Sequence, residues 1–366
     1  MRFGATCVLS RAIRIAAVAV ALSVITCAQK TPSSQSSSPT SAAQNPASSP
    51  SRSAQPIPSA QQSGQSPAAQ QPAQDQPQEP IRPDSGTEDA GRFVFKKEVQ
   101  EVMLHATVVD QAGHLVTTLD KNAFSIYQNG NLEPITSFRR EDVPVAMGIV
   151  IDNSGSMRDK REKVNQAVLN LIRVSNPQDE IFVVNFSQNS YLDQDFTSNV
   201  NLLQAALHQV STRGSTALYD AVVASAIHLR NNPRLNKKVL LVVTDGQDNM
   251  SRETLQEALR QLQPDKAPTV YAIGLTDEGF THAAHDALQS LAATTGGVAF
   301  FPQNLDEVNE ITRSVAHDIR SQYTLAYKPA GTITGYQAIR VEAKSPSGAR
   351  LIVRTRTGYY PGETVR

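Results

Sequence analysis

The sequence predicts an α/β fold, a doubly wound and mostly parallel sheet of Rossmann-like type, with a small flanking β domain built from both ends of the chain. Three observations predict it. In the middle of the chain, apolar runs rich in Val, Ile or Phe alternate with helical patterns, as in parallel sheets covered by helices. Segments with period-two alternation lie on both sides of this region. Polar motifs follow the apolar runs, where α/β proteins place their sites.

The central region, residues 144–320, supplies the strands and helices of the predicted sheet. Strands are expected at five apolar runs: 145–151, 181–186, 239–244, 270–275 and 298–301. Helices are expected around 164–172, 255–262, 284–291 and 308–315, where apolar residues recur at helical spacing. Asn304 with Glu307 is expected to cap the last helix.

The segments 92–143 and 321–366 carry the patterns of short antiparallel strands. Leu104, Ala106 and Val108 alternate with other positions, and Asn129-Gly130 is a hairpin turn signal. Fifty residues of strand are too few for an independent core. We therefore predict that the two segments pair into one small β domain, into which the central domain is inserted.

The first 27 residues have the composition of an export signal. Arg2, Arg11 and Arg14 precede an apolar run from Ile15 to Ile25, which is too short to cross a bilayer as a stable anchor. Residues 28–91 are mostly Ser, Gln, Pro and Ala. Such a segment cannot bury enough surface to offset the entropy of ordering, so we expect a disordered linker.

Two ways of processing the signal stay open at Cys27. The residues before Cys27 resemble a lipoprotein signal, in which the cysteine is lipidated, but Thr26 stands where Gly, Ala or Ser is usual. Ordinary cleavage near Ala28 is the alternative. Either way we expect an exported protein of the cell envelope, which is membrane-anchored through lipid on Cys27, or else secreted or periplasmic. Both cysteines, Cys7 and Cys27, lie in this segment, so the exported body has no disulfide.

The charge balance argues against nucleic acid as a partner. The chain has 34 basic and 34 acidic residues, and removal of the three signal arginines leaves 31 basic residues. A nucleic-acid partner would require a clustered basic face. The terminal strands do carry a basic group, which we expect to face water, with an anionic partner as the alternative. Its members are Arg340, Lys344, Arg350, Arg354 and Arg356.

Three separate motifs supply oxygen-bearing side chains near the predicted strand ends. Asp152, Ser154 and Ser156 follow the first strand, Thr216 lies in a Gly-containing loop before a helix, and Asp245 ends another strand. Ligands bind parallel sheets outside the carboxyl ends of the strands, where strand order reverses, so we expect Asp152 and Asp245 to lie together. A hard cation such as Mg²⁺ accepts carboxylate and hydroxyl ligands. Alone, the first motif is also typical of a helix start.

At all five positions the motifs resemble the metal-ion-dependent adhesion site of von Willebrand factor A domains. The resemblance implies that Ser154, Ser156 and Thr216 ligate Mg²⁺ or Mn²⁺ through their hydroxyls, while Asp152 and Asp245 hold it directly or through water. It further implies a sixth position that an Asp or Glu of a partner protein fills. The flanking strands and the closing Gly358-Tyr359-Tyr360 look like the exported von Willebrand A-related family of acidobacteria.

We expect a metal-dependent, adhesion-type protein-binding module on the cell envelope and not an enzyme. The alternatives are a structural or assembly factor of an envelope complex and, less favoured, a metal-assisted hydrolase that uses Asp248 as its base. Neither a G-x-S-x-G nucleophile motif nor a phosphate-binding loop motif occurs. Ser154 stands where a haloacid-dehalogenase-like phosphatase needs its second Asp.

Two further groups of polar residues have plainer interpretations beside the functional ones. His282 and His285 share a helix face but lack an H-E-x-x-H arrangement, so we expect a solvated face rather than a zinc site. Asp248 and the Ser190-Tyr191 loop could form the rim of the metal site and select the partner. The alternative is that they are ordinary loop residues.

Overall fold

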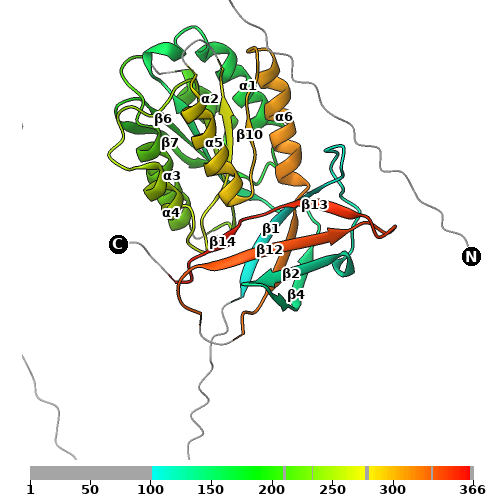
Figure 1. Cartoon of the computed structure of the whole chain (residues 1–366). Helices are drawn as coiled ribbons and strands as arrows, with labels where there is room; N and C mark the ends of the chain where they lie inside the picture. Colours follow the sequence, from blue (N-terminus) through cyan, green and yellow to red (C-terminus); the bar gives the residue numbers. More distant parts are fainter. Residues whose placement is uncertain (1–100, 209–211, 233, 277–279, 331–332, 363–366) are drawn as a thin grey trace, which may run out of the picture. The chain divides into compact units, whose positions relative to one another are not determined.

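The structure is a computed structural model that describes residues 101–208, 212–232, 234–276, 280–330 and 333–362. These residues belong to one compact unit that contains two sheets (Figure 1). The predicted export signal, 1–27, and linker, 28–91, lie outside the described residues. Within the described ranges, no helix is long and apolar enough to span a bilayer.

The central sheet has six strands in the order β10-β9-β8-β5-β6-β7. They are β5 (Val145–Asp152), β6 (Glu180–Phe186), β7 (Ser190–Thr197), β8 (Lys237–Thr244), β9 (Thr269–Gly274) and β10 (Ala299–Phe300). All neighbours pair in parallel except β7, which is antiparallel to β6. Every residue of β5 and β8 is buried, as expected for parallel strands covered on both faces. The predicted α/β sheet is confirmed.

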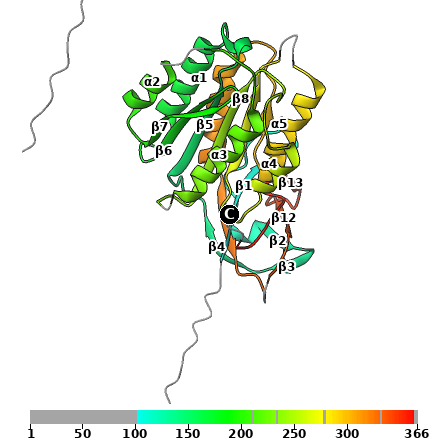
Figure 2. The same cartoon turned by 90° about the vertical axis from the view of Figure 1, so that its left-hand side faces the viewer.

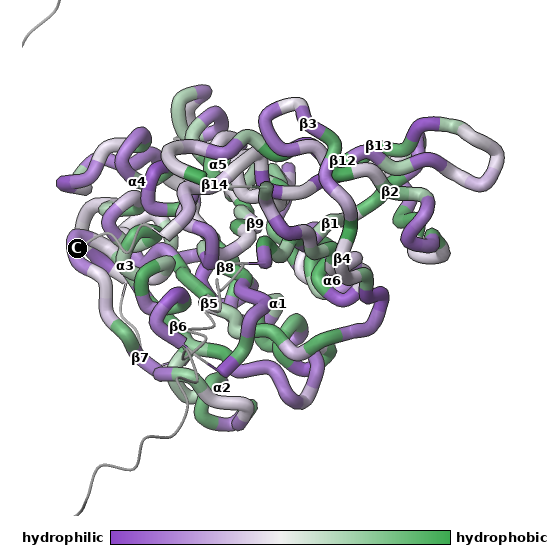
Figure 3. The backbone as a smooth tube through the Cα atoms, turned by 90° about the horizontal axis from the view of Figure 1, so that it is seen from below, coloured by the Kyte–Doolittle hydropathy of each residue, from purple (hydrophilic) through white to green (hydrophobic). Residues whose placement is uncertain are grey.

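Helices cover both faces of this sheet (Figures 1 and 2). One face packs against α1 (Arg161–Val174), α2 (Val200–His208) and α6 (Glu307–Arg320). The other packs against α3 (Leu218–Asn231), α4 (Leu255–Gln261) and α5 (His282–Thr295). Successive strand residues point to opposite faces of the sheet, so the apolar strands contribute side chains to the hydrophobic cores on both faces (Figure 3). The N-cap of α6 is Asp306 rather than the predicted Asn304, although the Asn304 side chain accepts a hydrogen bond from Glu307 N at 3.2 Å.

Close packing inside the sheet explains a glycine in β5. A Cβ atom built on Gly148 would lie 2.4 Å from the ring of Phe182 on β6 and 2.8 Å from a methyl group of Leu240 on β8. Such distances are far below van der Waals contact, so no larger residue fits without displacing a neighbouring strand. This glycine lets the large side chains of β6 and β8 meet across β5.

The Ser190-Tyr191 segment, predicted as a loop, is the first part of strand β7. Ser190 pairs with Phe186 and Tyr191 pairs with Asn185 at the end of β6. Both Tyr191 and Leu192 are exposed, because β7 is an edge strand. An edge strand with polar and exposed residues lacks the continuous apolar run that marks the buried strands.

The second sheet combines strands from both ends of the chain, as predicted. Its order is β3-β2-β12-β13-β1-β11-β4, and β14 also pairs with β12. The N-terminal strands are β1 (Val102–Val109), β2 (Phe124–Gln128), β3 (Asn131–Glu133) and β4 (Ile135–Arg139). The C-terminal strands are β11 (Tyr323–Tyr327), β12 (Gln337–Lys344), β13 (Arg350–Arg354) and β14 (Gly358–Tyr359). The β1–β11, β1–β13 and β2–β12 pairs all join the two ends. The predicted Asn129-Gly130 turn joins β2 to β3 with positive φ at both residues.

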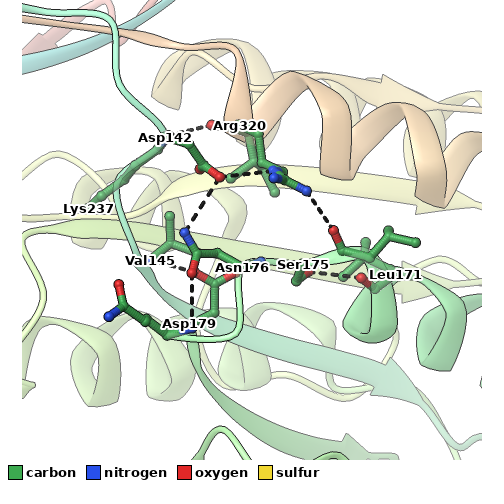
Figure 4. A network of polar contacts seen from close by, with 11 residues as sticks. Asp142, Val145, Leu171, Ser175, Asn176, Asp179, Lys237 and Arg320 are labelled. Atoms are coloured by element: carbon green, nitrogen blue, oxygen red, sulfur yellow. Dashed lines mark hydrogen bonds and ion pairs between the residues drawn. The ribbon is translucent and has the colours of Figure 1, made fainter.

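Polar contacts join several elements at the amino ends of β5 and β8 (Figure 4). Arg320 at the end of α6 donates to Asp142 Oδ2 at 3.0 Å and to the Val174 carbonyl at 2.9 Å. Asp179 accepts a hydrogen bond from Val145 N at 2.8 Å. The buried Lys237 ammonium donates to the carbonyl of Ile319 in α6. These contacts hold the end of α6 and the starts of β5 and β8 together.

Two members of the basic group bind the central domain, contrary to the prediction that the group faces water. Arg354 donates to Asp318 Oδ1 at 3.0 Å. Arg356 is only 8% exposed and donates to the carbonyls of Pro264 and Asp265. The partners lie on helix α6 and in the segment before β9, which the sequence pattern of a single strand does not reveal.

Candidate metal centre

The carboxyl edge of the central sheet brings Asp152 and Asp245 together. Asp152 is the last residue of β5, and Asp245 directly follows β8. Strand β5 lies between β6 and β8, so the order of the strands reverses at this point. The predicted location at a switch point is therefore what the topology provides.

Short hydrogen bonds link four of the five predicted ligands. Ser154 Oγ lies 3.1 Å from Ser156 Oγ, and Ser156 Oγ donates to Asp245 Oδ1 at 2.8 Å. Asp152 Oδ1 accepts from Ser154 N at 2.8 Å, and its Oδ2 accepts from Thr244 Oγ1 at 2.6 Å. The side chains of Asp245, Ser154 and Ser156 thus present their oxygens to a common point.

The loop that carries Thr216 is held against the first motif by backbone hydrogen bonds. Gly155 N donates to Gly214 O at 3.2 Å, and Arg213 N donates to Asn153 O at 2.9 Å. Thr216 Oγ1 lies 3.5 Å from the position of a Cβ atom built on Gly246, the residue after Asp245. The hydroxyl of the fifth predicted ligand therefore lies next to the residue that follows Asp245.

Burial makes this group of carboxylates unusual. Asp152 is fully buried and Asp245 is 2% exposed. Burial raises the pKa of Asp152, hydrogen bonds from Thr244 and Ser154 lower it, and the charge of Asp245 raises it further. Two neighbouring carboxylates in a low-dielectric site repel each other, and a cation placed between them relieves the repulsion.

Two basic residues at the start of α1 contact the site, and the sequence pattern did not identify them. Lys160 Nζ forms an ion pair with Asp245 Oδ2. The buried Arg161 donates from Nη1 to the Asp152 carbonyl at 3.0 Å and from Nη2 to Asn185 Oδ1. Burial lowers the pKa of Arg161 to about 10, which leaves it charged at neutral pH. In the sequence, their one distinguishing feature is their position at the start of the helix, eight and nine residues after Asp152.

The donor set fits a hard divalent cation. Two carboxylates and three hydroxyl groups are the oxygen ligands that Mg²⁺ or Mn²⁺ prefers. Gly155 and Ser156 are exposed, so the site is open to solvent on one side. The described residues contain no group of three or more His, Cys, Asp or Glu that could hold a metal, so a site here depends on the hydroxyl groups.

The other residues that the sequence singled out have structural roles. Asp248 Oδ2 accepts from Tyr219 N at 3.1 Å and from the Ser251 hydroxyl, which ties its loop to the start of α3. His285 stacks on Phe301 with ring centroids 4.0 Å apart. These contacts favour the plainer interpretations of Asp248 and of the two histidines.

Carboxylates and hydroxyls at the switch point of a parallel sheet define an α/β protein with a candidate metal site, and known families show which kind of α/β domain it is. Residues 147–247 match the family model of the von Willebrand factor type A domain. The central domain of this chain is a von Willebrand factor type A domain. A search of curated proteins finds no match to this sequence.

Three solved structures that are similar to this chain have sequence identities of 15% to 17%. BatB from Bacteroides thetaiotaomicron is 17% identical with a TM-score of 0.40, and the match covers 48% of this chain and 97% of that one. A von Willebrand factor type A protein from Catenulispora acidiphila is 15% identical with a TM-score of 0.43, covering 74% and 76%. Proximal thread matrix protein 1 from the mussel byssus, with a zinc-occupied MIDAS motif, is 16% identical with a TM-score of 0.43, covering 52% of this chain and 49% of that protein.

Proposed function

We propose that this protein binds a divalent cation, Mg²⁺ or Mn²⁺, and through it an Asp or Glu side chain of a partner protein. The proposed ligands are Asp152, Ser154, Ser156, Thr216 and Asp245. One observation carries the proposal: hydrogen bonds link two buried carboxylates and two serines at the open edge of a von Willebrand factor A domain, and the loop of Thr216 is bonded to the loop of those serines.

The composition of the site favours recognition of an acidic partner. A bound divalent cation would supply an open coordination position for the partner's carboxylate. The chain contributes five ligands, of which three are neutral hydroxyls, so one position of a six-coordinate cation would stay open for a partner's carboxylate. The backbone hydrogen bonds between the loops of Asn153 and Gly214 hold the ligands in place before binding.

Exposed apolar side chains beside the site support a protein partner. Tyr191 is 58% exposed and follows Ser190, which pairs with Phe186. The Phe186 carbonyl in turn accepts a hydrogen bond from Asn153 N in the metal loop at 2.6 Å. Met250 is 53% exposed, and its N–H donates to Thr216 O at 3.2 Å. Aromatic residues and Met are enriched in the centres of protein interfaces, so we infer that these two contact the partner around its acidic residue.

We further propose that the site binds and does not catalyse. Asp248, the candidate base of a hydrolase, accepts its hydrogen bonds from Tyr219 N and from Ser251 within its own loop. A base must reach the reacting proton, and a carboxylate engaged in this way is poorly available for it. The proposed setting is the cell envelope, after export, with Cys27 as the candidate site of a lipid anchor.

Metal-dependent stabilisation tests the proposal. Mn²⁺ or Mg²⁺ at about a hundred times its dissociation constant should raise the free energy of unfolding by about 2.7 kcal/mol. Thermal unfolding with and without metal should show this gain in the parent and in Asp159→Ala, which removes an exposed carboxylate near the site. Asp152→Ala should show no gain. Equal gains in all three proteins, or none in any, would contradict the proposed metal site, and partner binding that persists in excess chelator would contradict its role.

A further inference from the structure

Lys160 lies inside the group of candidate metal ligands. Its ammonium group forms an ion pair with Asp245 Oδ2, while the other oxygen of that carboxylate accepts from the Ser156 hydroxyl. The Lys160 side chain is only 14% exposed, and the Asp245 side chain is fully buried. The lysine therefore provides positive charge at a carboxylate that would otherwise face the charge of Asp152 in a low-dielectric site.

A divalent cation and this ammonium group cannot use Asp245 independently. Both require the carboxylate, and two positive charges brought to one small buried site repel each other strongly. Arg161 is different, because it reaches the Asp152 carbonyl and Asn185, outside the set of ligand oxygens. Of these two basic residues, Lys160 is the one whose described contact occupies an oxygen of a proposed metal ligand.

We propose that Lys160 is an internal competitor of the metal, which neutralises Asp245 in the metal-free protein and must leave it when a divalent cation binds. This inference rests on the proposed function, since it concerns the same site. Lys160 thereby sets the affinity for metal: it keeps the metal-free site stable, and it weakens cation binding by the cost of breaking its ion pair.

The local backbone allows Lys160 to leave without unfolding. Lys160 N donates to Met157 O at 3.0 Å, and the Lys160 carbonyl accepts from Val164 N at 3.1 Å in the first turn of α1. These bonds involve the main chain and not the ammonium group, so the flexible four-carbon side chain can rotate away from Asp245 while the backbone stays in place. The neighbouring Arg158 and Asp159 are exposed, which places solvent within reach of the released ammonium group.

Mn²⁺ titration of lysine variants tests the inference. Free Mn²⁺ is measured by electron paramagnetic resonance, and the heat of binding is measured by calorimetry, in the parent, Lys160→Met and Lys163→Met. Lys163 is a matched control, because it loses the same charge from the same helix, and its ion pair with Asp306 lies at the surface. We expect Lys160→Met to bind Mn²⁺ at least about tenfold more tightly than the parent. Lys163→Met should bind within about twofold of the parent, because exposed ion pairs contribute little.

A second readout concerns the metal-free proteins. Lys160→Met should melt below the parent without metal and should gain more from Mn²⁺ than the parent does, because its carboxylates have lost their ammonium partner. Lys160→Gln serves as a second variant if the methionine variant does not fold, and Lys160→Arg should restore weak metal binding.

The outcomes separate this inference from the proposed function. If the parent binds Mn²⁺ and neither Lys160→Met nor Lys160→Gln binds it more tightly than Lys163→Met does, the competition is refuted while the metal site stands. If none of these proteins binds Mn²⁺, both the metal site and the inference fail. Tight binding by Lys160→Met together with weak binding by the parent would establish the competition.

Discussion

The strands at the centre of the main sheet carry buried charges at both ends, a lysine at the amino edge and two aspartates at the carboxyl edge. At the amino edge, β8 begins with Lys237, whose ammonium group donates to the Ile319 carbonyl. At the carboxyl edge, β5 ends with Asp152 and β8 is followed by Asp245. Both edges contain acids and bases within hydrogen-bonding distance, yet they differ in what surrounds them.

At the amino edge, several elements close around the charges. Asp318 of α6 accepts from Arg354 of β13 and from Tyr271 of β9, and Asp142 accepts from Arg320 (Figure 4). At the carboxyl edge, Gly155 and Ser156 are exposed and the ligands come from loops. Removing one partner of a buried charge that is bonded from several sides strongly destabilises a fold, whereas a buried charge beside an open face can exchange one partner for another. The comparison therefore assigns structure to one edge and binding to the other.

Removing Arg354 should have the largest effect on stability. Arg354→Met leaves the buried Asp318 without its guanidinium partner and with only a neutral hydroxyl, that of Tyr271, among the described side chains that donate to it, so the free energy of unfolding should fall by about 3 kcal/mol, the cost of breaking a buried ion pair. Urea unfolding measures this fall, and Mn²⁺ affinity should stay unchanged. Arg350→Met is the control on the same strand, because Arg350 is 73% exposed in its pair with Glu342 and should lose less than about 1 kcal/mol. Equal losses in both variants would remove the distinction between a structural edge and ordinary surface charge.

The sequence predicted the features that depend on continuous burial. The five apolar runs became β5, β6, β8, β9 and β10 because strands covered on both faces need apolar residues at every position. The closeness of Asp152 and Asp245 was also predicted, because Asp152 ends one such strand and Asp245 directly follows another, while metal binding by these residues stays a prediction. The pairing of the two terminal segments was predicted because each segment is too short to form a core of its own.

The sequence did not predict contacts that depend on which way a long side chain turns. Lys160 and Arg161 read as the polar start of an amphipathic helix, and only the fold turns them toward the metal loops. Arg354 and Arg356 likewise bind helix α6 and the segment before β9. Strand β7 was missed because an edge strand tolerates polar residues on its exposed side.

Acid should weaken the amino edge through His105. Burial and the charges of Lys237 and Arg356 lower the pKa of His105 from 6.5 to about 3. The unfolded chain therefore binds a proton between pH 6.5 and 3 that the folded chain does not, so stability falls as pH falls through this window. Between pH 6.5 and 5 the loss should reach about 2 kcal/mol.

Urea unfolding at several pH values measures the His105 contribution. His105→Gln should flatten the dependence on pH between 6.5 and 5, while the exposed His285→Gln should retain the slope of the parent. Many groups titrate in this range, so the test compares the pH dependence of the free energy of unfolding between the two variants. A slope in His105→Gln as steep as that of the parent would show that the amino edge does not hold this histidine neutral.

A hydroxyl group removed from the carboxyl edge should affect binding more than folding. Thr216→Val keeps the shape of a buried side chain but deletes a proposed ligand, so Mn²⁺ affinity should fall about tenfold or more, equivalent to about 1.4 kcal/mol. The metal-free free energy of unfolding should change by less than that. Calorimetric titration and urea unfolding of the same samples give the two numbers. A loss of stability without a loss of affinity would place Thr216 with the structural residues of the amino edge.

The smallest effect is expected for a charge that belongs to neither edge. Arg340 on β12 is 55% exposed in its ion pair with Glu342, and its guanidinium carbon lies 4.2 Å from the centre of the Tyr127 ring. Arg340→Met should change the free energy of unfolding by about 0.5 kcal/mol, because water screens both contacts. Mn²⁺ affinity should match that of the parent, and the change should shrink further in 1 M salt, which urea unfolding at two salt concentrations measures. A loss as large as that of Arg354→Met would mean that charge alone, and not its enclosure by several elements, determines the stability of this protein.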